Sequence, residues 1–188
     1  MLLIKPIFES AGKVFENDLK HFYPAQGENG INERNLTYRF MSEFSKKYNN
    51  SRCFLEVPLL NKSTNKFDLH IDGLIIHDGI AIFIESKRLY SKEKATLIDK
   101  DISRLNYSNL TSIIANHGRI ESPNQFFALL IAETWETRVR DWWVGKQSSI
   151  KWDRNKLSSF STDFVPINHS ANENLNWLFA YKKIGQSA

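Results

Sequence analysis

The sequence lacks the features by which secreted and membrane-embedded chains are recognised. Its 188 residues contain one cysteine, Cys53, so an intrachain disulfide cannot form, and its apolar neighbours predict a buried thiol. The longest uninterrupted apolar run, 126–132, is far shorter than the roughly 20 residues of a membrane span. The first six residues hold too short an apolar stretch for a secretion signal. We therefore expect a cytoplasmic protein that neither crosses nor anchors to a membrane.

Proline and glycine are too few, at 5 and 8 residues, to form a linker that would divide the chain into domains. No internal repeat or low-complexity tract is present, so one domain spanning 1–188 is predicted. A chain of this length can bury about 70% of its unfolded surface and so form a true core. The net charge of +4 is compatible with a polyanionic partner, but many proteins of similar charge bind none.

The spacing of apolar residues predicts an alternation of helices and strands. Period 3.6 favours helices over about 6–22 and 32–48, and short apolar runs favour strands around 53–59 and 125–132. Residues 92–116 are predicted as helical, with a break near 106–109 left open. Segment 134–156 is predicted to begin as a helix and become irregular, and 176–184 to form a last strand. The expected order is α-α-β-β-β-α-β-α-β.

The run from Lys66 to Lys87 predicts a β-hairpin. Asp78-Gly79 is the strongest short turn signal because both residues tolerate positive φ, so His77 should pair with Ile80. Both arms are apolar on both faces near this turn. Strands of that kind are buried between two layers of helices, and only the far end of the hairpin is polar.

This register brings acidic residues together at the far end. Asp72 should lie opposite Glu85, and His70 opposite Lys87, with all four side chains on one face because strand residues alternate. Two carboxylates about 5 Å apart destabilise each other unless a cation lies between them. A divalent metal ion would compensate the two negative charges more fully than Lys87 alone. The alternative is a solvated cluster in which the two carboxylates pair with Lys87 and no metal is bound. Asp68, two positions further along the face, is a weaker candidate ligand.

Glu33 is the second unusual acid. It precedes Leu36 by three residues and Phe40 by seven, which places a carboxylate on the apolar stripe of the second helix. A role at the site competes with an ordinary role as a first-turn acid favoured by the helix dipole.

The pattern Asp72, twelve residues, then Glu85-Ser86-Lys87 resembles the PD-(D/E)XK nuclease superfamily. The resemblance covers about 30–132 and departs where Ile71 replaces the proline of the motif. It implies a restriction-endonuclease-like α/β/α sandwich with a central mixed sheet and core order α-β-β-β-α-β. The helix at 6–22 and the extension at 133–188 would be additions to that core.

The resemblance also implies a metal-dependent mechanism. Asp72 and Glu85 would bind Mg²⁺ or Mn²⁺, with the backbone carbonyl of Ser86 as a third ligand. Glu33 would act through a water on the metal. Lys87 would orient the attacking water and stabilise negative charge on the phosphate.

Basic residues are the candidates for nucleic-acid binding, because neutralised phosphates supply most of that affinity. They lie beside the motif and in segment 134–156, where they alternate with Trp142, Trp143 and Trp152. An amphipathic helix with core tryptophans explains the latter segment equally well. Asp101 and Arg104 are expected to form an intrahelical pair rather than a DNA contact. The candidates are Arg88, Lys92, Lys94, Arg138, Arg140 and Lys146.

The sequence thus predicts a Mg²⁺-dependent phosphodiesterase acting on nucleic acid, with DNA favoured. A dimer is expected if both strands of a duplex are cut. The alternative is a non-cleaving nucleic-acid-binding or recruitment module on the same fold. A soluble interaction protein without a nucleic-acid role is a third, weaker reading.

Overall fold

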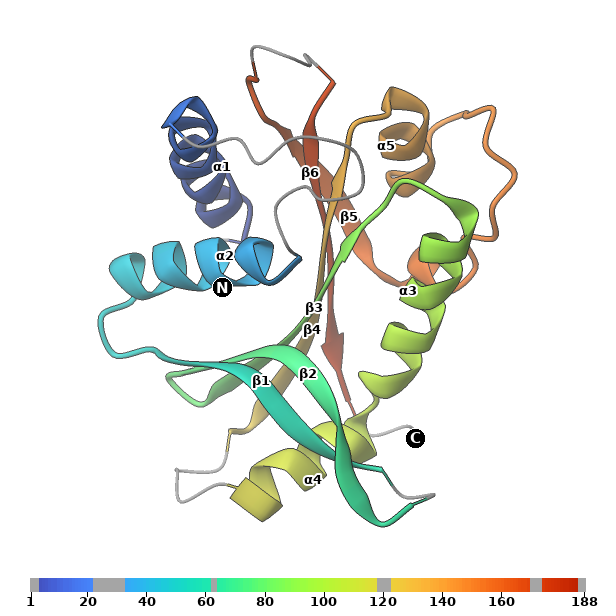
Figure 1. Ribbon diagram of the computed structural model, residues 1–188. Coiled ribbons are helices and arrows are strands. Elements are labelled where there is room, and N and C mark those ends of the chain that lie inside the picture. Colours follow the sequence, from blue (N-terminus) through green and yellow to red (C-terminus); the bar gives the residue numbers. More distant parts are fainter. Residues whose placement is uncertain (1–3, 22–32, 62–63, 118–122, 170–173, 186–188) are drawn as a thin grey trace.

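A computed structural model describes residues 4–21, 33–61, 64–117, 123–169 and 174–185 (Figure 1). In these ranges the chain forms a mixed six-stranded sheet of order β1-β2-β3-β4-β6-β5, in which β3 and β4 are parallel and all other neighbours antiparallel. The predicted α/β class is confirmed. The elements are α1 (Ile4–His21), α2 (Glu33–Lys47), β1 (Arg52–Asn61), β2 (Lys66–His77), β3 (Ile80–Arg88), α3 (Lys92–Arg104), α4 (Tyr107–His117), β4 (Gln125–Thr134), α5 (Thr137–Trp143), β5 (Ser161–Pro166) and β6 (Asn176–Ile184).

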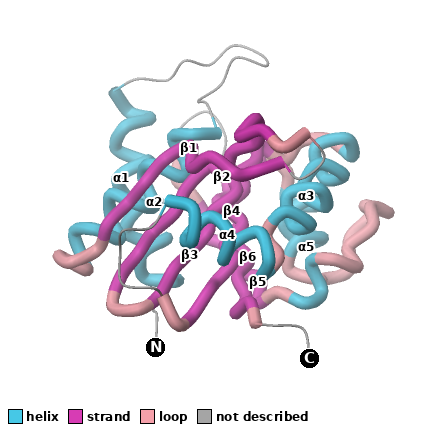
Figure 2. Tube along the Cα trace, turned by 90° about the horizontal axis from the view of Figure 1, so that it is seen from below, coloured by secondary structure: helices cyan, strands magenta, loops and turns pink. Residues whose placement is uncertain are grey.

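Helices cover both faces of the sheet, as the doubly apolar strands predict. Figure 2 shows the sheet separating α1 and α2 from α3 and α5. On the first side, Phe8 and Phe40 pack against strand residues such as Ile82, whereas on the second side Phe83 packs with helix residues such as Ile98. Consecutive residues of β3 therefore enter opposite cores, and both faces of this central strand are buried.

Most predicted elements are present, with shifts of a few residues at their ends. The helical segment after β3 is interrupted at 105–106, and the last strand has the predicted limits. The strand β5 was missed because its six residues are mostly half-exposed and include Asp163 and Pro166, which weaken a strand pattern. Cys53 is half-buried beside Ser45 rather than fully buried. Among the described residues, no helix is long and apolar enough to span a membrane.

The predicted hairpin register is correct only as far as the middle of β2. Pairs run from His77 with Ile80 to Gly73 with Ile84 and then stop, so Asp72 does not pair with Glu85. Beyond this point β2 pairs, among the described residues, with β1 alone, and His70 faces Pro58 instead of Lys87. The prediction extended one ladder along the whole hairpin, whereas β2 separates from β3 before the polar residues.

A backbone irregularity accompanies this separation. Glu56 has φ +53°, unusual for a non-glycine residue, and it lies opposite Asp72 between the pairs Leu55–Gly73 and Val57–Ile71. Ile75 and Ile71 of β2 are both odd-numbered and would share one face of a regular strand. Ile75, before the irregularity, instead packs in the core with α1 and α2, whereas Ile71, beyond it, packs in the core with α3. Face alternation therefore reverses at Asp72, and the prediction that His70 shares a face with Glu85 and Lys87 was wrong.

Gly73 allows α2 to approach the sheet at this place. A Cβ atom at Gly73 would lie 2.8 Å from Thr37 Cγ2 and 2.7 Å from Met41 Cε, so the helix side chains would have to shift to make room for it. The absent side chain thus lets α2 cross β2 closely. As a result, the N-terminal turn of α2, with Glu33, lies near the end of β3 (Figure 1).

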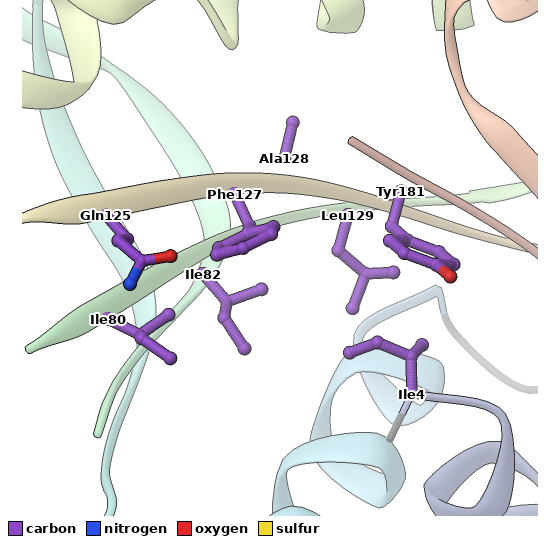
Figure 3. A pocket seen from close by; sticks show the side chains of 8 residues that line it. All are labelled: Ile4, Ile80, Ile82, Gln125, Phe127, Ala128, Leu129 and Tyr181. Carbon is purple, nitrogen blue, oxygen red and sulfur yellow. The ribbon is translucent and has the colours of Figure 1, made fainter. Parts of the chain in front are cut away.

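The opposite end of β3 and β4 has an apolar hollow of about 320 Å³. Figure 3 shows the side chains of Ile82, Phe127 and Leu129 directed toward the side of the sheet where Ile4 of α1 lies, with Ala128 directed to the other side. The two ends of the same strands therefore differ in chemistry. The hollow is lined by Ile4, Ile80, Ile82, Gln125, Phe127, Ala128, Leu129 and Tyr181.

Candidate active site at the end of β3

Asp72 contacts β3 through Ser86 instead of facing Glu85 across a ladder. Its Oδ2 accepts hydrogen bonds from the Ser86 amide at 2.6 Å and from Ser86 Oγ at 2.9 Å. Thr37 of α2 donates to the same Ser86 hydroxyl at 2.9 Å. Because β2 has left the ladder, the carboxylate satisfies the amide that a paired strand would otherwise satisfy. Asp72 is thereby fixed at the point where the two strands diverge.

Glu85 points to the other face, toward α3. Its side chain is only 1% exposed, and Oε1 accepts a hydrogen bond from Arg104 Nη2 at 2.9 Å. Burial raises the pKa of Glu85 to about 8, helped by the charges of Asp101 and Asp72, and the opposing effect of Arg104 is too small to cancel this. The other oxygen, Oε2, is buried without a hydrogen-bond partner among the described residues.

Lys87 lies on the same face and pairs with α3. Its Nζ is 3.1 Å from Asp101 Oδ2 and 3.2 Å from the Ser86 carbonyl oxygen. Burial alone lowers the pKa of Lys87, but the neighbouring carboxylates, Asp101 foremost, raise it on balance above the usual lysine value. Lys87 is therefore held as a cation, suited to stabilising negative charge rather than to accepting a proton.

Glu33 reaches the end of β3 from the opposite side. Its Oε1 accepts a hydrogen bond from the Arg88 amide at 2.9 Å and lies 3.8 Å from Lys94 Nζ. The carboxylate is partly exposed, so it retains contact with solvent. The structure thus brings Glu33, Asp72, Glu85 and Lys87 to one strand end, with Glu33 toward α2, Glu85 and Lys87 toward α3, and Asp72 bound to Ser86 between them. The charge of Asp72 acts on the pKa of both Glu85 and Lys87.

Two acids at this end were not predicted as site residues. Asp101 of α3 is buried, accepts a hydrogen bond from Arg104 and forms an ion pair with Lys87, so the expected intrahelical pair with Arg104 exists but also extends to β3. Its signal was a carboxylate three residues after Ile98, on the buried stripe of the helix, which is the criterion that selected Glu33.

Glu133 is the other missed acid. It ends the apolar run of β4 directly beside Arg88 of β3, and its Oε1 lies 3.6 Å from Arg88 Nε. Burial raises the pKa of Glu133 to about 7 against the lowering effect of Arg88. Because β3 and β4 are parallel, their final residues meet at the same edge of the sheet. That rule could have identified Glu133 once the parallel pair was recognised.

The donors suit a hard cation in type but not in number. No group of three or more His, Cys, Asp and Glu side chains in the described part of the chain is arranged to hold a metal ion. The two predicted carboxylate ligands and the Ser86 carbonyl are oxygen donors, as Mg²⁺ and Mn²⁺ prefer, and the buried Oε2 of Glu85 has an unused acceptor position. These residues fit such an ion as a partial coordination shell that water or phosphate oxygens would complete.

The basic residues next to the motif surround this end of the sheet. Lys92 is exposed at the start of α3, while Arg88 and Lys94 are partly buried by their acidic partners. Tyr90 is about half exposed, and its ring lies 5.9 Å from Arg88 Cζ and 5.7 Å from Lys94 Nζ. An exposed aromatic ring among cations suits contact with an unstacked base, but sequence reasoning did not single out Tyr90.

The basic and aromatic segment 134–156 proves to be largely structural. Trp142 and Trp143 are buried, and the guanidinium of Arg154 donates to the Trp143 carbonyl oxygen. Arg138 pairs with Glu136, and Arg140 pairs with Asp141 while stacking on Phe164. Lys146 is exposed just after α5. The reading of the tryptophans as core residues is confirmed for Trp142 and Trp143, and binding of nucleic acid by Arg138, Arg140 and Lys146 stays a prediction.

Comparison of the chain with protein-family models, with curated proteins and with solved structures finds no match.

Proposed function

We propose that this protein is a divalent-metal-dependent nuclease that hydrolyses phosphodiester bonds in DNA, built on a restriction-endonuclease-like fold. The order of elements supports the fold: α2, the antiparallel strands β1 to β3, the helices α3 and α4, and β4 parallel to β3 follow the order expected of that family. The end of β3, where the motif residues gather, would be the active site. Cytoplasmic location and assembly as a dimer are further predictions of this proposal.

The observation that carries the proposal is the unbalanced state of Glu85. A carboxyl group with 1% exposure costs free energy unless its charge is compensated, and the nearby cations leave its pKa at about 8 and its Oε2 unpartnered. A divalent cation bound to Glu85, with Asp72 close enough to act on the pKa of that carboxyl group, would remove this cost. Strongly perturbed acids that meet at a strand end are typical of catalytic sites.

Each residue then has a chemical role. Asp72, Glu85 and the Ser86 carbonyl would hold the metal, which when bound polarises the phosphate and activates water for attack. Lys87, kept protonated by Asp101, would donate hydrogen bonds to the phosphate oxygens as negative charge develops. Glu33, partly exposed beside Lys94, can accept a proton from the attacking water or orient it.

A non-cleaving module on the same fold is the second candidate. It is favoured by the ion pairs that Arg104 and Lys87 make with Glu85 and Asp101, since these already compensate part of the negative charge without a metal. Such a protein would bind nucleic acid in a salt-dependent way but release it intact.

The test is cleavage of plasmid, linear duplex and single-stranded DNA with Mg²⁺, Mn²⁺ or EDTA. Metal-dependent cutting should fall at least about a hundredfold in Asp72→Asn and in Lys87→Ala, because each removes a group that acts on the reacting phosphate. Asp68→Asn is the matched control, since Asp68 lies on the same strand, is exposed and bonds only Thr64 in the described structure. Circular dichroism would verify folding.

Full cleavage by Asp72→Asn would reject the assignment of the site. Salt-dependent binding with no cutting by the wild-type protein under any metal condition would instead favour the non-cleaving module.

A further inference from the structure

Arg104 contacts both acids on the α3 side of the site with one nitrogen atom. Its Nη2 lies 2.9 Å from Glu85 Oε1 and 2.6 Å from Asp101 Oδ1. A single positive group therefore bridges two buried carboxylates. A metal ion bound to Glu85 would perform the same electrostatic function for that carboxylate.

The pairing of Arg104 with Glu85 is incomplete. Strong arginine–carboxylate pairs are bidentate, with two parallel hydrogen bonds, whereas this one has a single bond. Within the described residues, Arg104 Nε and Glu85 Oε2 are both buried without hydrogen-bond partners. Each group thus keeps an unused donor or acceptor, and replacement of the contact by a better-matched cation would satisfy Glu85 more fully.

Asp101 offers Arg104 a second attachment. The two residues are three positions apart on α3, and Asp101 is itself fixed by Lys87 at 3.1 Å. The Arg104 side chain is 29% exposed, whereas that of Glu85 is 1% exposed. Arg104 can therefore move toward solvent while Asp101 holds it, but Glu85 cannot follow.

We propose that Arg104 is the resident counter-ion of the metal site: it occupies Glu85 in the metal-free protein and yields that carboxylate to the divalent cation while staying attached to Asp101. This inference rests on the metal of the proposed function. After the exchange, the guanidinium lies at the edge of the site with donors available to a substrate phosphate. Arginine and metal ion then compete for Glu85, and the competition sets the metal affinity.

The test is direct binding of Mn²⁺, measured from the signal of free Mn²⁺ in electron paramagnetic resonance without nucleic acid. Arg104→Gln should bind Mn²⁺ about tenfold tighter or more, because a positive charge close to the ion is removed. Arg104→Lys keeps the charge and should stay near the wild-type affinity. Asp101→Asn should bind Mn²⁺ more weakly, because it removes negative charge near the ion and because Arg104, without its bond to Asp101, would stay on Glu85.

Arg39→Gln is the matched control. Arg39 pairs with Asp18 at 2.6 Å and has a similar exposure of 30%, but it lies on α2 and contacts none of the site residues named above. Its loss should leave the Mn²⁺ affinity unchanged. If Arg104 had a merely structural role, Arg104→Gln would bind Mn²⁺ more weakly, because loss of the side chain would loosen the site.

Unchanged or weaker Mn²⁺ binding by folded Arg104→Gln overturns the inference. Should that variant fail to fold, a crystal structure of the wild-type protein with Mn²⁺ decides: Arg104 still bonded to Glu85 overturns it, and Arg104 on Asp101 alone supports it. The two proposals fail separately. Tighter Mn²⁺ binding without any cleavage supports this inference and rejects the nuclease, whereas cleavage with unchanged Mn²⁺ affinity does the reverse.

Discussion

The two ends of the parallel strands β3 and β4 differ sharply. At their starts, Ile80, Ile82 and Phe127 line an apolar hollow beneath α1, and at their ends Glu85 and Glu133 are almost fully buried among cations. Burial of apolar surface stabilises the fold, whereas burial of carboxyl groups opposes it. Apolar burial thus stabilises the sheet at one end, and burial of carboxyl groups destabilises it at the other. Proteins retain such unfavourable groups at functional sites.

The largest effect on stability that does not depend on pH is expected from the apolar end. Ile82 is 1% exposed, and Ile82→Ala removes buried methyl groups beside the hollow, so the free energy of unfolding should fall by about 3 kcal/mol. Urea unfolding would measure this fall, with the half-exposed Ile80→Ala as a milder control. Mn²⁺ affinity of the folded variant should not change. Weaker Mn²⁺ binding by the folded Ile82→Ala variant would show that the two ends of the sheet are coupled.

At the charged end, removal of a carboxyl group should stabilise the metal-free protein at high pH. The folded-state pKa of Glu85 is about 8, above its ordinary value of 4.5, so the folded state binds the proton more tightly and unfolding becomes easier as pH rises between these values. The glutamine side chain of Glu85→Gln has no carboxyl group to titrate. The stability of this variant relative to wild type should therefore rise by on the order of 4 kcal/mol from pH 4.5 to 9 in EDTA.

Glu133→Gln provides the internal comparison for that pH series. Its folded-state pKa is about 7, so the relative gain in stability should be smaller and should level off about one pH unit earlier. Urea unfolding of both variants and the wild type at several pH values would resolve the two windows. A difference in stability that is independent of pH for both variants would mean that neither carboxyl group is destabilised by burial.

The smallest effect concerns nucleic-acid binding. Lys92 is exposed at the charged end, and Lys183 is exposed on β6 opposite Phe127, near the apolar end. Lys92→Ala should weaken DNA binding several-fold and lower the slope of log affinity against log salt by about 1, as loss of one phosphate contact does. Lys183→Ala should leave both unchanged. Equal effects of the two variants would place the binding surface elsewhere.

Local patterns in the sequence predicted the elements well. Asp78-Gly79 set the hairpin register correctly from His77–Ile80 to Gly73–Ile84, since a two-residue turn determines the pairs that follow it. Apolar periodicity located α2 and its buried stripe, and the apolar run of β6 gave its exact limits. These features depend on residues close in sequence, which is why one chain suffices to predict them.

The sequence named four residues that gather at the end of β3, but it did not give their geometry. Asp72 and Glu85 do lie at one strand end, yet they approach it from different directions, because β2 separates from β3 and alternation reverses opposite Glu56. The sequence does not reveal the positive φ of Glu56, because glutamate rarely adopts a positive φ. A prediction that follows alternation through such a position must assign the wrong face.

The sequence by itself determined the turn, the pairing next to it, the doubly buried strands and the residue types available for chemistry, because these follow from local backbone preferences and apolar spacing. Only the tertiary structure decided that Asp72 would bind the Ser86 amide and that Asp101 and Arg104 of α3 would join Glu85 and Lys87. Those contacts depend on how α2 and α3 pack on the two faces of the sheet, and packing is set by the whole core at once.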